Sequence, residues 1–203
     1  MGSDLTLMTV SNWKSELPTL TSRLVTLREP TSSDLGPLVN LLSLHDATHF
    51  GLDQPASEIA VQQLIERAAR DRAAGLGFTY VITLNPSRTL VGLIQVRQLD
   101  PSFEAAEWEC TIAPSARGSG VFLETARLVG SFAFGSVGAH RLEARVLLQN
   151  GRGNGALRKL GAVQEGVLRR SLRRRGEYLD RVLWSMLKED WGEHWVSTAP
   201  RVH

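Results

Sequence analysis

A glycine-spaced turn between a predicted strand and a predicted helix is the part of the sequence best suited to chemistry. Residues 113–122 read Ala-Pro-Ser-Ala-Arg-Gly-Ser-Gly-Val-Phe, after a strand-like stretch at 107–112 and before an amphipathic helical pattern. Backbone N–H groups converge at such a helix start, and the helix dipole adds positive potential. Gly118 and Gly120 let the backbone approach a phosphate closely, and Arg117 adds a fixed charge. The turn therefore predicts a phosphate-binding site, although a plain surface turn can have the same composition.

Two carboxylates on the preceding strand are candidates for acid–base chemistry. Glu107 and Glu109 alternate along it, so with Thr111 they share one face, and Cys110 lies on the other. Carboxylates on a central strand are costly to bury unless they have a task. An amine with a pKa of about 8 to 10.4 is mostly protonated at neutral pH, and a carboxylate with a raised pKa could remove that proton. We expect Glu109, which is nearer the turn, to be the base and Glu107 to be the second candidate; the alternative is a solvated sheet face.

Alternating and helical patterns place these residues in a chain of mixed elements. Strands are predicted at 20–28, 78–84, 90–99, 103–112, 142–148, 162–170 and 178–187, and helices at 34–44, 58–74, 122–134 and in a short segment ending at 160. The three strands before the glycine turn form an antiparallel meander, and the last two strands form a hairpin. On the second helix, five residues make the apolar side: Ile59, Val61, Leu64, Ile65 and Ala68.

Four stretches, in order along the chain, carry a resemblance to one enzyme superfamily. They are Leu-Thr-Ser-Arg-Leu-Val-Thr-Leu-Arg at 20–28 with Asp34 behind it, Arg-Gly-Ser-Gly at 117–120, the segment from Asn150 to Leu160 and Gly161, and Asp-Arg-Val-Leu-Trp-Ser-Met-Leu at 180–187 followed by Asp190 and Trp191. This ordered set resembles the GNAT superfamily of N-acetyltransferases, in its ribosomal-protein-acetyltransferase-like (RimJ/RimL-like) branch. The resemblance covers residues 19–191, nearly the whole chain.

The resemblance implies a fold and a reaction. The fold is α/β (α+β), with helices flanking a mixed, mostly antiparallel sheet of about six to seven strands, two of which splay apart at an acetyl-CoA cleft. A primary amine attacks acetyl-CoA directly in a ternary complex, Glu109 or Glu107 takes its proton, and no metal takes part. Contacts to coenzyme A are implied for these residues: Thr111 and Ile112 through their backbone, then Arg117, Gly118, Ser119, Gly120, Val121, Phe122, Asn150 and Arg158.

Three positions depart from the pattern of the superfamily. Phe122 stands where Gly or Ala is frequent, and Gly153 stands where Ser is usual. Leu157 replaces a Tyr that often protonates the leaving thiolate. A thiol with a pKa near 8.5 can leave with little help, so the acid is expected to be water or Tyr178. Asn150 also suits a helix N-cap, and Arg158 a solvated helix surface.

The acceptor is the least determined part of the prediction. The branch favours a protein N-terminal amine, and a small-molecule amine such as an antibiotic or polyamine is the alternative. Five arginines crowd residues 169–175 of the predicted hairpin, where Arg173, Arg174 and Tyr178 are candidates for acceptor contacts. A solvated loop has the same composition. Homodimer formation is left open.

Two other classes of protein compete with this interpretation. Residues 151–156 read Gly-Arg-Gly-Asn-Gly-Ala, which satisfies a dinucleotide-binding spacing, but the repeated strand–helix–strand units of such a fold are missing. A non-catalytic acyl-CoA sensor or protein-interaction module would keep the phosphate turn and lose the acid–base residues. The missing Tyr makes the sensor the more serious alternative.

Composition sets the outer limits. The 203 residues predict an extension at 1–18, a single domain at 19–195 and a tail at 196–203. A net charge of +2 gives no general attraction to nucleic acid, and no apolar run is long enough for a membrane span. A single cysteine excludes an intramolecular disulfide and fits a cytoplasmic protein. His45 and His49 are four residues apart, with no third metal ligand near them.

Overall fold

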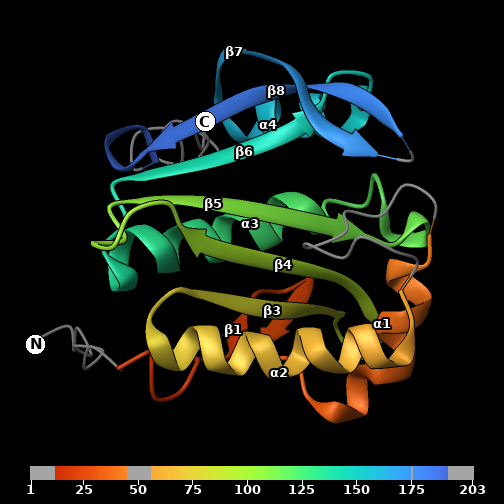
Figure 1. The fold of residues 1–203 in the computed structure, drawn as a ribbon. Coiled ribbons are helices and arrows are strands. Elements are labelled where there is room, and N and C mark those ends of the chain that lie inside the picture. The colour runs from red at the N-terminus through yellow and green to blue at the C-terminus, as the bar shows by residue number, and fades with distance from the viewer. Residues whose placement is uncertain (1–11, 45–55, 175, 192–203) are drawn as a thin grey trace, which may run out of the picture.

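The computed structural model describes residues 12–44, 56–174 and 176–191 and contains one mixed sheet with helices on both faces (Figure 1). The strands are β1 (Leu20–Thr21), β2 (Val25–Arg28), β3 (Gly77–Leu84), β4 (Leu90–Gln98), β5 (Ala105–Ile112), β6 (Arg141–Leu147), β7 (Val163–Arg174) and β8 (Glu177–Leu187), and the helices are α1 (Leu35–Leu42), α2 (Glu58–Ala74), α3 (Val121–Phe132) and α4 (Gly151–Leu160). The strand order is β1-β2-β3-β4-β5-β6-β8-β7. Every neighbouring pair is antiparallel except β5 and β6, which are parallel.

The sheet has eight strands because the segment predicted as one strand at 20–28 is two strands, β1 and β2. A tight turn at Ser22 separates them: the Ser22 hydroxyl accepts hydrogen bonds from the backbone N–H groups of Leu24 and Val25, and the Ser22 N–H donates to the Val25 carbonyl. Serine competes with regular backbone bonding in this way, which an alternation pattern does not reveal.

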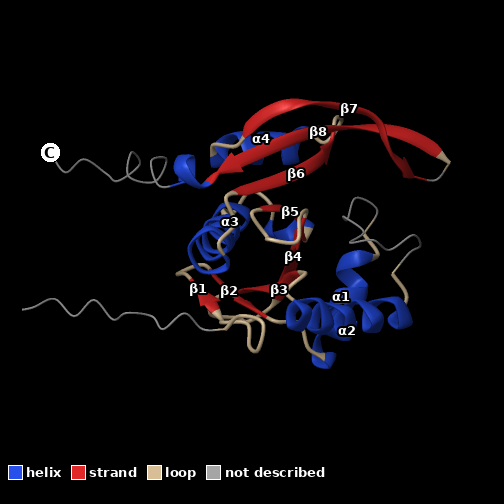
Figure 2. Ribbon diagram, turned by 60° about the vertical axis from the view of Figure 1, so that its left-hand side comes forward, coloured by secondary structure: helices blue, strands red, loops and turns tan. Residues whose placement is uncertain are grey.

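Two apolar cores lie on opposite faces of the sheet. The larger one, here the main core, includes Val129 of α3 and Leu160 of α4. The second core packs Leu38 of α1 and Leu64 of α2 against Leu93 of β4. Figure 2 shows α3 on one side of β3 and β4 and α1 with α2 on the other; the far end of the β7–β8 hairpin curves toward the α1 side.

The packed domain begins before the boundary predicted at residue 19. Trp13 and Leu17, each 7% exposed, belong to the main core. The Trp13 ring meets Phe78 and Phe103 edge-on, at centroid distances of 5.8 and 5.7 Å. An isolated aromatic residue upstream of the first strand carries no periodicity, so the sequence pattern misses this contact.

Helix α2 begins and ends where its capping residues predict, but one residue of its predicted apolar side is exposed. The Ser57 hydroxyl accepts a hydrogen bond from the Ala60 N–H as an N-cap, and Gly75 ends the helix in a left-handed conformation. Four of the five predicted apolar residues are buried, but Ile59 is 73% exposed. Ile59 lies in the first turn, two positions from Val61, and therefore points away from the apolar side.

Candidate active site

The parallel pairing of β5 with β6 stops halfway along both strands. Register pairs join Ala105, Ala106 and Glu107 to Arg141, Leu142 and Glu143, and no pairs follow them. Residues 108–112 of β5 and 144–147 of β6 are therefore not paired with each other, and we call this region the β5–β6 split. The predicted splaying of two strands is confirmed.

Backbone groups of β5 alternate between β4 and the β5–β6 split. The Ala113 N–H donates to the Val91 carbonyl at 2.7 Å, and the Ala105 carbonyl accepts from the Leu99 N–H at 2.7 Å, so the odd-numbered groups face β4. The even-numbered groups, including those of Ile112, face the split. The backbone of Thr111 faces β4, whereas that of Ile112 faces the split, so of the two residues predicted to bind coenzyme A through their backbone only Ile112 presents backbone groups there.

The glycine turn has the backbone conformation that its sequence requires. Gly118 and Gly120 have φ values of 79° and 89°, in the left-handed region. Gly120 is the N-cap of α3, where no side chain caps the first N–H groups. A Cβ atom at Gly118 would meet nothing within 4 Å, so the space beside the turn is open. These features fit a diphosphate group, because uncapped N–H groups at a helix start bind phosphate oxygens.

Side chains around the turn are held by local contacts. Arg117 Nε donates to the Ile112 carbonyl at 2.9 Å, and the Ser119 hydroxyl donates to the Ala116 carbonyl at 2.6 Å. Val121 is fully buried, and the partly buried Phe122 ring packs against the main core. The large residue at 122 is thus accommodated by the core beneath α3.

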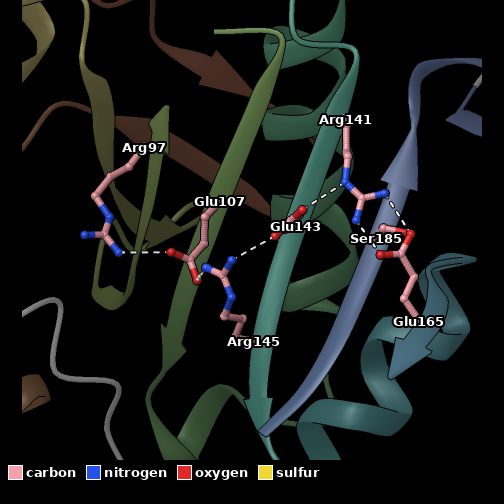
Figure 3. Close-up of polar contacts among 7 residues, drawn as sticks. All are labelled: Arg97, Glu107, Arg141, Glu143, Arg145, Glu165 and Ser185. Carbon is pink, nitrogen blue, oxygen red and sulfur yellow. Dashed lines mark hydrogen bonds and ion pairs between the residues drawn. The ribbon is translucent and has the colours of Figure 1, made fainter. Parts of the chain in front are cut away.

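Glu107 lies in a chain of ion pairs that crosses the sheet from β4 to β7 (Figure 3). The chain, here the ion-pair ladder, comprises Arg97, Glu107, Arg145, Glu143, Arg141 and Glu165, and ends at Ser185. Arg145 donates to Glu107 at 2.7 Å and Arg97 donates to it at 3.2 Å. Both carboxylate oxygens of Glu107 are therefore occupied by arginines.

Glu109 differs from Glu107 although it lies on the same face of β5. Its Oε2 atom is buried and has no hydrogen-bond partner. Burial raises the pKa of Glu109 and the negative charge of Glu107 adds to the rise, while the positive charges of Arg97, Arg181 and Arg145 oppose it. A carboxylate with a raised pKa is a stronger base than an ordinary glutamate and is a candidate to accept the proton of an amine.

Opposite the two glutamates, the other face of β5 is apolar. Cys110 packs against the main core, and burial raises the pKa of its thiol to about 12. A thiolate therefore does not form at neutral pH, which argues against a covalent acetyl-cysteine route.

Helix α4 uses its polar residues mainly for structure. The Asn150 side chain accepts a hydrogen bond from the Gly153 N–H at 2.9 Å, as an N-cap. A Cβ atom at Gly153 would lie 2.8 Å from the Asn150 side-chain nitrogen, which explains glycine at this position. Leu157 is 4% exposed in the main core, and the guanidinium of the exposed Arg158 lies over the Trp184 ring at 5.6 Å.

The hairpin residues predicted for the acceptor lie at the far end of β7 and β8. The Arg173 guanidinium lies 5.9 Å from the centroid of the Tyr178 ring, which is 61% exposed. Arg181, further along β8, donates from Nε to the Ser171 hydroxyl and from Nη2 to the Ser171 carbonyl, both at 3.0 Å. Sequence reasoning missed Arg145 and Arg181. The alternation of Arg141, Glu143 and Arg145 along one strand was the available signal for the first.

Neither a metal cluster nor a membrane-crossing helix occurs in the part of the chain that the structure describes. His45 and His49 lie outside that part.

Comparisons with known proteins agree with this geometry. The model of the acetyltransferase (GNAT) domain family matches residues 24–163. An uncharacterized N-acetyltransferase, YoaA from Bacillus subtilis (strain 168), is 28% identical over 169 residues, which cover 83% of this chain and 95% of that protein. The structure of Mycobacterium smegmatis RimJ in complex with CoA-disulfide matches with a TM-score of 0.77 at 20% identity, over 92% of this chain and 95% of that one. A chimera of spermidine N-acetyltransferase SpeG from Vibrio cholerae matches with a TM-score of 0.71 at 22% identity, over 84% and 98%.

The chain therefore belongs to the GNAT acetyltransferase family. It is an enzyme that transfers an acyl group, and the predicted superfamily is confirmed.

Proposed function

We propose that this enzyme moves the acetyl group of acetyl-CoA to the N-terminal amine of a protein, with Glu109 as the general base. The observation that carries the proposal is the state of Glu109: a buried carboxylate oxygen without a partner, beside the β5–β6 split, in a group whose pKa is raised. An ammonium ion cannot attack a thioester, so a base with a raised pKa supplies what the reaction needs.

In the proposed reaction the neutral amine nitrogen attacks the acetyl carbonyl carbon. Glu109 first takes one proton from the ammonium ion and releases it to solvent; the C–N bond then forms, the C–S bond breaks, and the second nitrogen proton passes through water to the departing sulfur. Backbone N–H groups of even-numbered β5 residues can polarise the carbonyl oxygen. Leu157 is in the core and the hydroxyl of Tyr80 donates to the Pro18 carbonyl at 2.9 Å, so neither supplies the acid, and Tyr178 is 61% exposed on the hairpin.

Binding of the coenzyme is assigned to the turn at 117–122 and to the even-numbered backbone of β5. Arg117 adds positive charge there, and Gly118 and Gly120 leave the backbone accessible. Asn150 and Arg158 are assigned weaker contacts to coenzyme A. The Asn150 side chain caps α4, and the Arg158 guanidinium lies over the Trp184 ring.

A protein N-terminus is the proposed acceptor, and a polyamine is the competitor. Ribosomal-protein acetyltransferases and spermidine acetyltransferases both occur among the solved proteins with this fold. The fold alone is compatible with either acceptor, so the distinction depends on the charges around Glu109.

The test compares Glu109→Gln with Glu104→Gln, a matched change of an exposed glutamate just before β5. Thiol release from acetyl-CoA measures turnover, and calorimetry measures coenzyme A binding. We expect kcat of the Glu109 variant to fall by about 10²- to 10⁴-fold with coenzyme A affinity unchanged, because only proton removal is lost. Turnover within a few-fold of the wild type would contradict the role of Glu109.

The same assignment predicts a pH dependence. Because the pKa of Glu109 is raised, the acid limb of kcat/KM should lie above the ordinary value of about 4.3. The charged groups acting on Glu109 are Arg97, Glu107, Arg181 and Arg145, of which the arginines stay protonated throughout. The limb should vanish in the residual activity of Glu109→Gln and persist in Glu104→Gln.

A further inference from the structure

On the face of the sheet that carries Glu109, the described residues near the β5–β6 split include two charged side chains outside the ion-pair ladder. Three arginines and three glutamates of the ion-pair ladder neutralise one another. Glu109 and Arg181 are left, one negative and one positive. Among the described residues, each arginine of the ladder has a carboxylate within 3.2 Å, whereas Arg181 has none.

Arg181 lies on the same face of the sheet as the ladder and Glu109. It stands four residues before Ser185 on β8, whose hydroxyl donates to Glu165 of the ladder, so both side chains emerge on one face. Its register partner is Leu147, at the end of β6 where the β5–β6 split is open. The positive charge of Arg181, like those of Arg97 and Arg145, opposes the rise in the pKa of Glu109.

An irregular stretch of β7 holds the guanidinium in place. Between the pairs Leu168–Arg181 and Leu172–Leu179, three residues of β7 face the single residue Asp180. The Asp180 carboxylate accepts the Arg170 N–H at 2.7 Å, and Arg170 adopts a φ of 51°.

This irregularity places Ser171 against Arg181, which gives two hydrogen bonds to neutral oxygens. A guanidinium has five N–H donors, so three are left after these two bonds.

A purely structural arginine would not be expected in this position. Ser171 offers neutral acceptors only, and a partly buried cation without a carboxylate has an unfavourable desolvation energy. The remaining donors, together with the nearby proton acceptor Glu109, match a ligand that carries an ammonium group and an anion.

We propose that Arg181 binds a carboxylate of the acceptor, so that the preferred substrate is a peptide with an acidic residue next to its N-terminal amine. The proposal rests on the function proposed above and adds the chemical class of the acceptor. A polyamine has no anion for Arg181 and would be repelled by its charge.

The experiment uses two peptides, Ala-Asp-Gly-Phe amide and Ala-Asn-Gly-Phe amide, which differ by one carboxylate. Spermidine and β-alanine, a small amine with its own carboxylate, complete the set. The enzymes are the wild type, Arg181→Gln, Arg181→Lys and Arg70→Gln. Arg70 is an exposed arginine of α2 and serves as the matched control. Thiol release gives kcat and KM, and calorimetry in the presence of coenzyme A gives peptide affinity without turnover.

We expect the wild type to prefer the Asp peptide by about 10- to 100-fold in kcat/KM, mainly through KM, as for a hydrogen bond to a charged group. Arg181→Gln should remove the preference, Arg181→Lys should keep part of it, and Arg70→Gln should leave it unchanged. A lower KM for β-alanine than for the Asp peptide would overturn the peptide acceptor, even if Arg181→Gln removed this preference too.

Equal use of both peptides, a preference for spermidine, or a preference unchanged in Arg181→Gln would overturn the proposal while the acetyltransferase activity stands. If no amine released thiol, the proposed function would fail. Calorimetry would then still decide about Arg181, because equal affinity for the two peptides would exclude the carboxylate site.

Discussion

The part of β5 that pairs with β6 and the part beside the β5–β6 split each carry a glutamate, and the surroundings of the two side chains are opposite. At the end paired with β6, Glu107 is bound by Arg97 and Arg145. Two residues further along β5, beside the β5–β6 split, Glu109 has a buried carboxylate oxygen with no hydrogen-bond partner, and its pKa is raised. The difference arises because pairing with β6 brings arginines to the first glutamate and ends before the second.

The comparison shows where charge stabilises the fold and where it is kept for chemistry. A carboxylate whose two oxygens each contact an arginine is held by these ion pairs and stabilises the strands that they join. A carboxylate that is desolvated without a close partner is energetically unfavourable when ionised, and this same property makes it able to accept a proton. Substitutions at the two positions should therefore have opposite consequences for stability and turnover.

The largest effect on stability is expected at the paired end. Glu107→Gln removes the negative charge between Arg97 and Arg145, and two cations then face each other across a neutral amide. We expect the free energy of unfolding to fall by about 1–3 kcal/mol, because charged hydrogen bonds of a buried carboxylate are lost. Urea unfolding checks this, with Glu104→Gln as the control.

An unchanged midpoint for Glu107→Gln would contradict the structural role of the ladder. A loss of turnover at full stability would instead make Glu107 the base and remove the distinction between the two ends.

Sequence patterns were sufficient for most of the elements around this site. The alternation of Glu107, Glu109 and Thr111, the glycines at 118 and 120 and the N-cap at Ser57 are local features, and local features depend on backbone geometry that the sequence encodes directly. The face shared by the two glutamates and the turn before α3 are therefore where they were predicted.

Partners between distant strands could not be predicted in the same way. The matching of Glu107 by Arg145 depends on the parallel register of β5 and β6, which is set by the whole sheet. The position of Arg181 depends on two extra residues in β7, and Trp13 reaches the core from outside any periodic segment. The sequence ranks Glu109 above Glu107 only because Glu109 is nearer the glycine turn. The difference in their charged surroundings depends on arginines from other strands, so only the folded chain reveals it.

A smaller effect, of the opposite sign, is expected at the split end. Because the pKa of Glu109 is raised in the folded protein, folding favours its protonated form, and stability is lost as pH rises from the ordinary value of 4.5 through the raised value. Glu109→Gln stays neutral and escapes this loss. The variant should therefore gain stability relative to the wild type between pH 4 and pH 8, as measured by thermal unfolding across that range. A relative loss over that range would show that ionised Glu109 is stabilised by a partner.

The smallest effect is expected at the outer end of the ladder, where Glu165 is bound by Arg141 and by the Ser185 hydroxyl. These contacts lower the pKa of Glu165 to about 2 from an ordinary value of 4.5, so its contribution is present above pH 4.5 and is lost as pH falls toward 2. The side chain is 35% exposed and solvent screens the pair, so Glu165→Gln should cost less than about 1 kcal/mol at pH 7. The difference in the free energy of unfolding between Glu165→Gln and the wild type should shrink as pH falls below 4.5. For Glu109→Gln the variant is the more stable protein, so the two differences have opposite signs. A difference that grew on acidification would mean that Glu165 is not stabilised as the ionised group, and the contrast between matched and unmatched carboxylates would then fail at its outer end.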